Sequence, residues 1–299
     1  MGARQAGTPG DVTTRASALV LVGATLLGSL PAWGRAIYRT EPDPLRVVTW
    51  RALFATGLLL LVLAAVRRDL LSIRLRDLPF FAVYAFLAVT LNFLAYFSAV
   101  KHTSIAVAVI LLYTYPAFVA VLSALFLAER LTREKALALL ITLAGAALVI
   151  QVHQPAALRL NARGIAWGLA AGITAALYSI FGKKALGRYS PFTVVLYAFG
   201  LGGIFLALWA GPASLVGAQY PPSAWLLLLG LAAIPTVGGY ACYTIGRKNL
   251  EASRASILAM WEVVAAALLG YALFGEALDT GQIAGALLVV LGIFSLGRR

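Results

Sequence analysis

Long apolar runs separated by short polar connections extend along almost the whole chain. A helix needs ~20 apolar residues to cross ~30 Å of hydrocarbon, and these runs lack the alternation typical of membrane-spanning strands. The pattern therefore predicts an all-α membrane protein with ten transmembrane helices. The expected spans are residues 17–38, 45–66, 79–100, 103–127, 134–151, 164–184, 190–210, 223–246, 253–274 and 280–297.

Composition supports the membrane assignment and limits the other classes. Hydrophobic residues make up 62% of the 299 residues and charged residues only 12%, which is more apolar surface than a water-soluble domain can bury. The net charge of +13 arises from short clusters of Lys and Arg between the apolar runs, so a nucleic-acid partner is not expected. The lone Cys242 lies in an apolar run and cannot form an intrachain disulfide.

The second half of the chain repeats features of the first half 147 positions later. The matching residues are Tyr96, Ala108, Ile110, Glu129, Leu131 and Gly145 in the first copy, and Tyr243, Ala255, Ile257, Glu276, Leu278 and Gly292 in the second. Duplicated apolar units are a frequent plan of secondary transporters. The expected units are five-helix repeats at 17–151 and 164–297. Because five is odd, the second copy enters the membrane from the opposite side, and the repeat is inverted.

The distribution of cations predicts the orientation. If the amino terminus is cytoplasmic, most of the 24 Lys and Arg residues fall in inner segments, as the positive-inside rule requires. The loop containing Arg130 and Arg133 loses both cations in its second copy, as expected for a loop moved outside. We therefore expect a multi-pass protein of the inner (cytoplasmic) membrane with both termini in the cytoplasm, and residues 1–16 form a disordered cytoplasmic tail.

The two copies resemble the EamA-type ten-helix exporters of the drug/metabolite transporter superfamily. The resemblance rests on the segments Tyr96–Thr132 and Tyr243–Asp279, each a helix, a short turn, a second helix and a Glu-containing exit. Many relatives have Glu-Pro where this chain has Glu262-Val263, so a proline-associated kink is expected only at Pro116. The resemblance implies export of a small metabolite by alternating access, from a cavity lined by helices other than the fifth and tenth. Members of similar layout export amino acids, including aromatic ones.

Polar and aromatic side chains near mid-membrane are the candidate substrate contacts, because inverted-repeat carriers bind near the midplane. Asn92 and Tyr96 share one helix face, and a kink at Pro116 would free a backbone carbonyl beside its tyrosines. An aromatic or amphipathic solute would suit this set. The competing interpretation is that these residues pack helices or form interfacial belts. The candidates are Trp33, Asn92, Tyr96, Tyr113, Tyr115, Tyr178, Tyr243, Trp261 and Glu262.

Three ionisable residues have two interpretations each. Glu262 lies mid-way along its apolar run, where a charge is costly, so it is expected either to couple transport or bind substrate, or to form a structural hydrogen bond or ion pair. Arg35 and Arg51 lie nearer the outer ends of their helices. Each could hold a substrate carboxylate or extend to the lipid headgroups.

Other features limit the remaining classes. His102 and His153 fall at separate helix ends, and no HExxH or phosphate-loop motif occurs, so neither catalysis nor a metal or other cofactor is expected. A ridge of Gly164, Gly168 and Gly172 predicts close helix contact, within the bundle or between protomers, and leaves a monomer or a homodimer open.

The sequence thus predicts a secondary transporter that exports a small zwitterionic or amphipathic metabolite, with amino acids favoured. The only partners expected are this small-molecule substrate and the lipid bilayer. The alternatives are a multidrug or other small-metabolite carrier of the same architecture, and a non-transporting receptor or channel. Both facilitated diffusion and proton antiport remain open as the driving mechanism.

Overall fold

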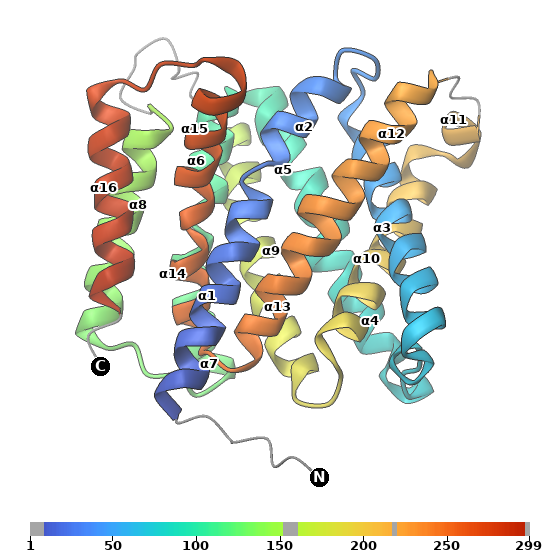
Figure 1. Ribbon diagram of the computed structural model, residues 1–299, viewed down its shortest axis with the longest axis horizontal. Helices are drawn as coiled ribbons and strands as arrows, with labels where there is room; N and C mark the ends of the chain where they lie inside the picture. Colours follow the sequence, from blue (N-terminus) through green and yellow to red (C-terminus); the bar gives the residue numbers. More distant parts are fainter. Residues whose placement is uncertain (1–8, 152–160, 217–219, 297–299) are drawn as a thin grey trace.

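The computed structural model describes residues 9–151, 161–216 and 220–296, and these residues form helices without any strand. The first half contains α1 (Pro9–Leu27), α2 (Leu30–Ile37), α3 (Pro44–Val66), η1 (Arg68–Leu71), η2 (Leu75–Asp77), α4 (Leu78–Ala85), η3 (Phe86–Thr90), α5 (Leu91–His102), α6 (Ile105–Leu112), α7 (Tyr115–Phe126) and α8 (Arg133–Val149). The second half contains α9 (Ala162–Leu186), α10 (Pro191–Ala210), α11 (Pro212–Val216), α12 (Pro222–Leu231), η5 (Ala232–Gly239), α13 (Tyr240–Lys248), α14 (Ala252–Ala259), α15 (Trp261–Phe274) and α16 (Thr280–Ser295). Together they form an upright bundle (Figure 1).

In the described part of the chain, eight helical stretches are long and apolar enough to cross a membrane. They are Asp11–Ile37, Pro44–Val66, Leu75–His102, Ile105–Phe126, Ala162–Leu186, Pro191–Ala210, Pro222–Lys248 and Ala252–Phe274. The two remaining expected spans correspond to α8 and α16, which have 17 and 16 residues. At 1.5 Å per residue each is about 25 Å long, slightly short of a full hydrocarbon layer.

The first helix begins earlier than expected. We expected a polar tail over residues 1–16, but α1 already begins at Pro9. Its first turn contains Asp11, and an acidic residue is favourable at the positive end of a helix dipole. Residues 1–8 of the expected tail, and the expected helix-end residue His153, lie outside the described residues. The beginning of α1 and the end of α16 lie at the same end of the bundle (Figure 1).

Short polar side chains determine where several helices begin. At the start of α3, the Asp43 side chain accepts a hydrogen bond from the Leu45 amide at 2.9 Å. At the start of α6, the Ser104 hydroxyl oxygen accepts one from the Val107 amide at 3.2 Å. Asp279 forms a reciprocal capping box with Gln282 at the start of α16. Each cap satisfies a backbone N–H that has no partner within its helix, which is why the chain turns into a helix at these points.

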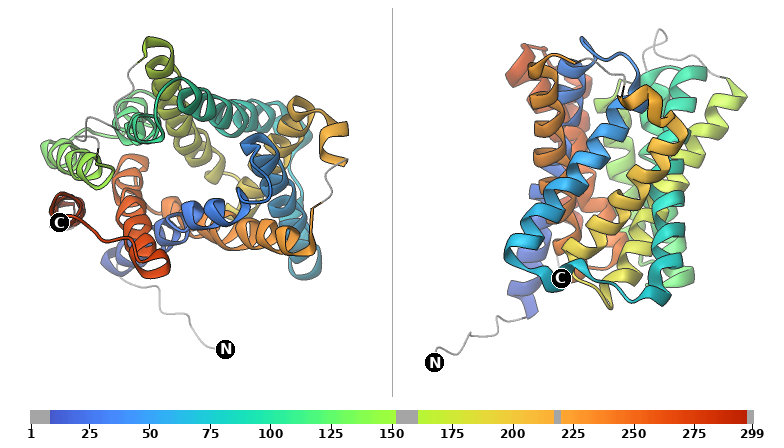
Figure 2. Two further views of the ribbon diagram at one scale, coloured as in Figure 1. Left: turned by 90° about the horizontal axis from the view of Figure 1, so that it is seen from above. Right: turned by 90° about the vertical axis from the view of Figure 1, so that its right-hand side faces the viewer.

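Helices α8 and α16 pack against each other beside the ring formed by the other helices (Figure 2). They run antiparallel and their backbones touch at glycines. A Cβ on Gly145 would lie 2.6 Å from the Gly285 carbonyl oxygen, and one on Gly292 would lie 3.0 Å from that of Ala138. The shift of 147 positions that relates the two halves of the sequence converts the first of these contacts into the second.

Irregular helix turns occur at matching places in the two halves. A π-helical segment occurs at η3 (Phe86–Thr90) and another at η5 (Ala232–Gly239). The chain also breaks between α6 and α7, where Pro116 occupies the first turn of α7, and again between α14 and α15. A break is thus present at Pro116, where a proline-associated kink was expected, and a second break occurs in the other half without a proline. In the second half a tight turn interrupts the helix: the Met260 amide donates to the Ile257 carbonyl, three residues back, at 3.1 Å.

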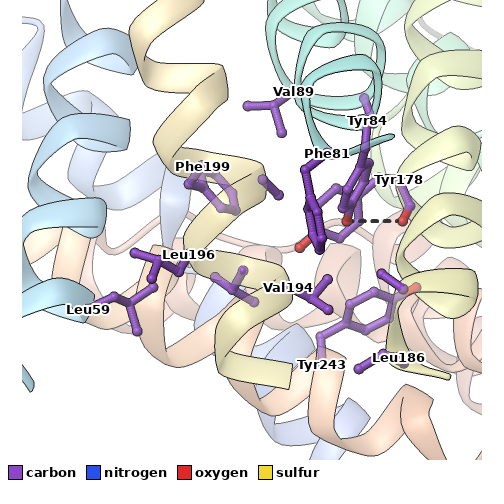
Figure 3. Packing of buried hydrophobic residues seen from close by; sticks show 14 of the residues in the cluster. Leu59, Phe81, Tyr84, Val89, Tyr178, Leu186, Val194, Leu196, Phe199 and Tyr243 are labelled. Carbon is purple, nitrogen blue, oxygen red and sulfur yellow. Dashed lines mark hydrogen bonds between the residues drawn. The ribbon is translucent and has the colours of Figure 1, made fainter. Parts of the chain in front are cut away.

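The largest buried cluster contains residues of α1, α3, α4, η3, α9, α10, α13 and α14 and is rich in aromatic rings (Figure 3). The rings of Tyr84 and Tyr178 are tilted against each other, with centroids 5.5 Å apart, and the Tyr84 hydroxyl donates a hydrogen bond to the Tyr178 carbonyl at 3.4 Å. Phe81 and Phe199 are also almost fully buried in this cluster. Several residues of this cluster, among them Tyr178, Phe199 and Tyr243, also line the cavity described next.

Candidate functional site

A cavity of about 140 Å³ lies inside the bundle. Its lining residues are Leu27, Ala88, Val89, Asn92, Phe93, Leu112, Tyr113, Tyr115, Ala175, Tyr178, Ser179, Phe199, Tyr240, Tyr243, Ala259 and Glu262. They come from both halves of the chain, and none belongs to α8 or α16. This agrees with the expectation that the fifth and tenth apolar runs do not face the substrate.

The amide of Asn92 is fixed at the cavity wall between two helices. Its Nδ2 donates to the Ala171 carbonyl at 2.8 Å and to Thr174 Oγ1 at 3.1 Å, both on α9. The hydroxyl of Thr174 in turn donates to the Ala170 carbonyl at 2.8 Å. Because both amide protons are engaged, Asn92 is oriented by α9 before any ligand is present.

Glu262 is the only carboxylate among the cavity-lining residues. It lies in the first turn of α15, where the break after Met260 creates a new helix start whose dipole favours a negative charge. The phenol of Tyr113 lies within hydrogen-bonding reach of its carboxylate, and Arg51 lies near enough to interact with it electrostatically. The helix break thus places an acid at the cavity wall with one donor and one nearby cation.

Arg51 borders this site, whereas Arg35 does not. The Arg51 side chain, on α3, is only 6% exposed and its guanidinium lies 4.6 Å from the centroid of the cavity-lining Phe93 ring. Its Nε is buried without a hydrogen-bond partner. Arg35 is exposed, forms an ion pair with Glu276 and lies over the ring of Phe274. Of the two arginines considered for a substrate carboxylate, only Arg51 is therefore positioned near the cavity.

Six of the nine expected contact residues line the cavity: Asn92, Tyr113, Tyr115, Tyr178, Tyr243 and Glu262. The other three are placed elsewhere. Trp33 lies in α2, beyond the break that follows α1, and packs against Gly230 of α12. Tyr96 stands edge-on to Phe97 and does not line the cavity, although it shares a helix with Asn92. Trp261 donates from Nε1 to Thr25 Oγ1 at 2.9 Å, which turns its ring toward α1.

Sequence reasoning missed other parts of the lining. Tyr240 precedes Tyr243 by three positions and so lies on the same helix face, which is a signal that could have found it. Its ring stands edge-on to Phe199, with centroids 4.7 Å apart. Phe93 and Phe199 have no such signal, because apolar aromatic residues also occur throughout the lipid-facing surfaces.

Arg247 is the least expected member of the site region. The expected span 223–246 ends just before it, but α13 continues to Lys248 and the Arg247 side chain is fully buried. Its guanidinium lies about 5 Å from the rings of both Tyr178 and Tyr243, and Nη1 donates to the Tyr178 carbonyl at 3.1 Å. Its Nε and Nη2 have no hydrogen-bond partner. A buried cation therefore lies directly behind two residues of the cavity floor.

Polar contacts join the helices beyond this floor. The ammonium group of Lys183 donates to the carbonyls of Arg247 at 2.9 Å and Leu250 at 2.5 Å. The carboxylate of Glu129 accepts from the backbone amides of Ala252 and Ser253 at 2.5 and 3.1 Å, and so caps α14. Glu129 belongs to the first half and α14 to the second, so this contact closes the seam between them.

The glycine ridge on α9 packs inside the bundle. A Cβ on Gly164 would lie 2.3 Å from the side chain of Thr103, and one on Gly168 would lie 2.5 Å from that of Leu111. Gly172 faces Thr114 at a similar distance. The ridge brings α9 close to α5 and α6, which carry part of the cavity wall. Among the described residues no group of three or more His, Cys, Asp or Glu side chains could hold a metal ion.

Comparison with known proteins identifies the family. The model of the EamA-like transporter family matches this chain twice, over residues 14–151 and 162–298. The chain belongs to the EamA-like transporter family. It is therefore a multi-pass membrane transporter, and the family assignment implies a small-molecule substrate and a lipid bilayer as its surroundings.

Individual relatives agree with this assignment. An uncharacterised transporter of Archaeoglobus fulgidus is 30% identical over 92% of this chain and 94% of its own length. A probable terminal-alkyne amino-acid exporter of Streptantibioticus cattleyicolor is 27% identical over 76% of this chain and 75% of its own length. The pseudopaline exporter CntI of Pseudomonas aeruginosa is 26% identical over 70% of this chain and 71% of its own length. A crystal structure with 18% identity superposes with a TM-score of 0.80 over 95% of this chain and 96% of the other, so the fold is shared.

Proposed function

We propose that this protein exports small zwitterionic or amphipathic metabolites, amino acids and aromatic ones in particular, across the cytoplasmic membrane by alternating access. The observation that carries the proposal is the cavity, whose wall combines tyrosine rings, the oriented amide of Asn92 and the single carboxylate of Glu262. Such a wall suits a solute with a flat apolar body and a charged polar end. Two relatives are named as exporters, one of an amino acid and one of pseudopaline.

The proposed architecture is ten transmembrane helices in two inverted five-helix repeats, at residues 17–151 and 164–297. Three observations support it: the repeated sequence, the paired π-helical segments and helix breaks, and the reciprocal glycine contacts of α8 and α16. The family model also matches two separate segments of the chain. Both termini are proposed to be cytoplasmic, consistent with the cation distribution and with the position of α1 and α16 at one end of the bundle (Figure 1).

In the proposed binding mode the two ends of an amino acid meet opposite charges. The substrate ammonium group lies near Glu262 and its carboxylate near Arg51, while an aromatic side chain lies against Tyr178 and Tyr240. Asn92 and Tyr113 supply directional hydrogen bonds. Because the cavity draws its wall from both halves, movement of one half against the other would expose the substrate to each side in turn.

A multidrug carrier is the second candidate, and the aromatic lining favours it, since such rings bind many apolar solutes. A non-transporting receptor or channel would share the same cavity. Saturable counterflow separates these classes: a carrier accelerates uptake of a labelled solute when unlabelled solute is present on the other side, whereas a channel or receptor does not.

The test uses the purified full-length protein in liposomes. Vesicles are loaded in turn with radiolabelled phenylalanine, tryptophan, leucine, glutamate and lysine, and efflux is followed with and without a pH gradient. Empty liposomes give the background. Saturable efflux and counterflow of at least one amino acid are expected. If none of the five moves faster than in empty liposomes, the proposed substrate class is wrong.

A further inference from the structure

Three charged side chains lie in or directly behind the cavity wall. Glu262 lines it, Arg51 lies behind the lining residue Phe93, and Arg247 lies behind Tyr178 and Tyr243. Arg51 is 6% exposed and Arg247 is fully buried. These three side chains carry two positive charges and at most one negative charge. Their summed charge is therefore positive whether Glu262 is ionised or protonated.

Neither arginine is neutralised by a carboxylate in direct contact. The ion pairs within 4 Å that the structure describes include neither Arg51 nor Arg247. Each also has buried N–H groups without an acceptor: Nε of Arg51, and Nε and Nη2 of Arg247. Removing a charge from water costs several kcal/mol unless a counter-charge is near, and intramembrane cations are retained mainly where they act on a transported solute.

We infer that the cavity selects solutes with a free carboxylate and disfavours organic cations. This inference rests on the proposed transport function and narrows its substrate class. Arg51 supplies the positive charge that acts on the solute carboxylate, because its guanidinium lies 4.6 Å from the ring centroid of the lining residue Phe93. Arg247 contributes its charge through the floor, since its guanidinium is shielded from the cavity by the Tyr178 and Tyr243 side chains.

The aromatic lining taken alone would lead to the opposite selectivity. Tyrosine and phenylalanine rings attract cations through their faces, and cages of such rings bind quaternary ammonium groups. Here the faces of Phe93, Tyr178 and Tyr243 are already approached by arginine. In a medium of low dielectric constant, two fixed positive charges oppose a third. The charge of the solute therefore separates this inference from a carrier of cationic drugs.

The test measures binding of three probes that share a phenylethyl body and differ in charge. N-acetyl-L-phenylalanine is an anion, L-phenylalanine a zwitterion, and phenethyltrimethylammonium a permanent cation. Each labelled probe is titrated against the full-length protein in nanodiscs of phosphatidylcholine, because a neutral lipid avoids attraction of cations to the membrane surface. The anion and the zwitterion, which both have a free carboxylate, are each expected to bind at least about tenfold more tightly than the cation.

Matched variants assign the effect to the arginines. Arg51→Gln is expected to reduce the anion-to-cation ratio to below about threefold, whereas Arg51→Lys, which keeps the charge, retains most of it. Both variants are first checked for a single symmetric peak in size-exclusion chromatography. The inference is overturned if the cation binds as tightly as the anion, or if no probe binds saturably.

These outcomes remain distinct from those of the proposed function. Cation binding equal to anion binding, together with amino-acid efflux, would overturn only the charge selectivity. The expected binding order without any efflux or counterflow would instead overturn transport and leave the site as that of an anion-binding receptor.

Discussion

The guanidinium of Arg247 lies directly against the backbone of Gly182. A Cβ at position 182 would fall 2.2 Å from Nη2 and 2.8 Å from Cζ of the arginine. Helices α9 and α13 approach each other here, and only a glycine leaves room for a buried guanidinium between them. This contact holds the arginine beneath Tyr178 and Tyr243, and so supports the floor of the cavity.

Gly182→Ala should therefore displace Arg247 and destabilise the protein by about 1–3 kcal/mol, as overpacking of a tight core does. The measurement is the thermal unfolding midpoint of the purified protein in detergent. Gly57→Ala is the control, since no atom lies within 4 Å of a Cβ at that position, and it should leave the midpoint nearly unchanged. Combined with Arg247→Ala, the effect of Gly182→Ala should shrink, because the clashing group is gone. Equal effects in both backgrounds would contradict the contact.

Replacing the cavity carboxylate should impair transport. Glu262→Gln removes the charge but keeps the size of the side chain, so we expect amino-acid efflux to fall at least about tenfold and its dependence on the pH gradient to disappear. Glu276→Gln is the matched control, because Glu276 lies at the exposed end of the same apolar run and pairs with Arg35. Unchanged rate and unchanged pH dependence in Glu262→Gln would rule out a coupling role.

Crowding the contact between α8 and α16 should affect stability without affecting binding. In Gly145→Val the new Cβ would lie only 2.6 Å from the Gly285 carbonyl oxygen. The clash should lower the free energy of unfolding by about 1–3 kcal/mol. Neither helix lines the cavity, so the Kd of a bound solute should stay within about twofold. Ala144→Val, on the exposed side of α8, is the control. A large change in Kd would show that this pair is coupled to the site.

The loop carboxylate Glu41 should make stability depend on pH. Burial alone would raise the pKa of Glu41, but hydrogen bonds from Tyr220 and the Asp43 amide, together with the charge of Arg46, lower this pKa below its ordinary value. A lowered pKa in the folded state adds stability that is present above the unfolded pKa and is lost as pH falls through the folded value. Tyr220→Phe should therefore lower the unfolding midpoint at pH 7.

This loss should shrink as the pH falls through the lowered pKa of Glu41 in the folded wild type, because Glu41 is then protonated in both proteins. The measurement compares the unfolding midpoints of wild type and Tyr220→Phe over this range. Tyr271→Phe, at an exposed tyrosine, serves as the control. A difference between wild type and Tyr220→Phe that stays constant with pH would mean that Glu41 is not the group responsible.

Local sequence rules predicted most helix positions but not how the helices are turned. Asn92 and Tyr96 are four residues apart on one face, yet only Asn92 lines the cavity, because α9 holds its amide through Ala171 and Thr174. Trp261 was expected beside Glu262 in the site, but its indole is drawn to Thr25 of α1. Such partners lie far away in the chain, so spacing within one helix cannot identify them.

The apolar runs by themselves determined that this is a helical membrane protein built from two related halves, because a bilayer leaves the backbone no partner except its own helix. Only the tertiary structure decided that the Arg247 side chain is buried behind the cavity wall. It also decided that a new helix, α15, begins just before Glu262 although no proline interrupts the chain there. The physical reason is that these features depend on contacts such as that of Arg247 with Gly182, which form only when distant helices pack together.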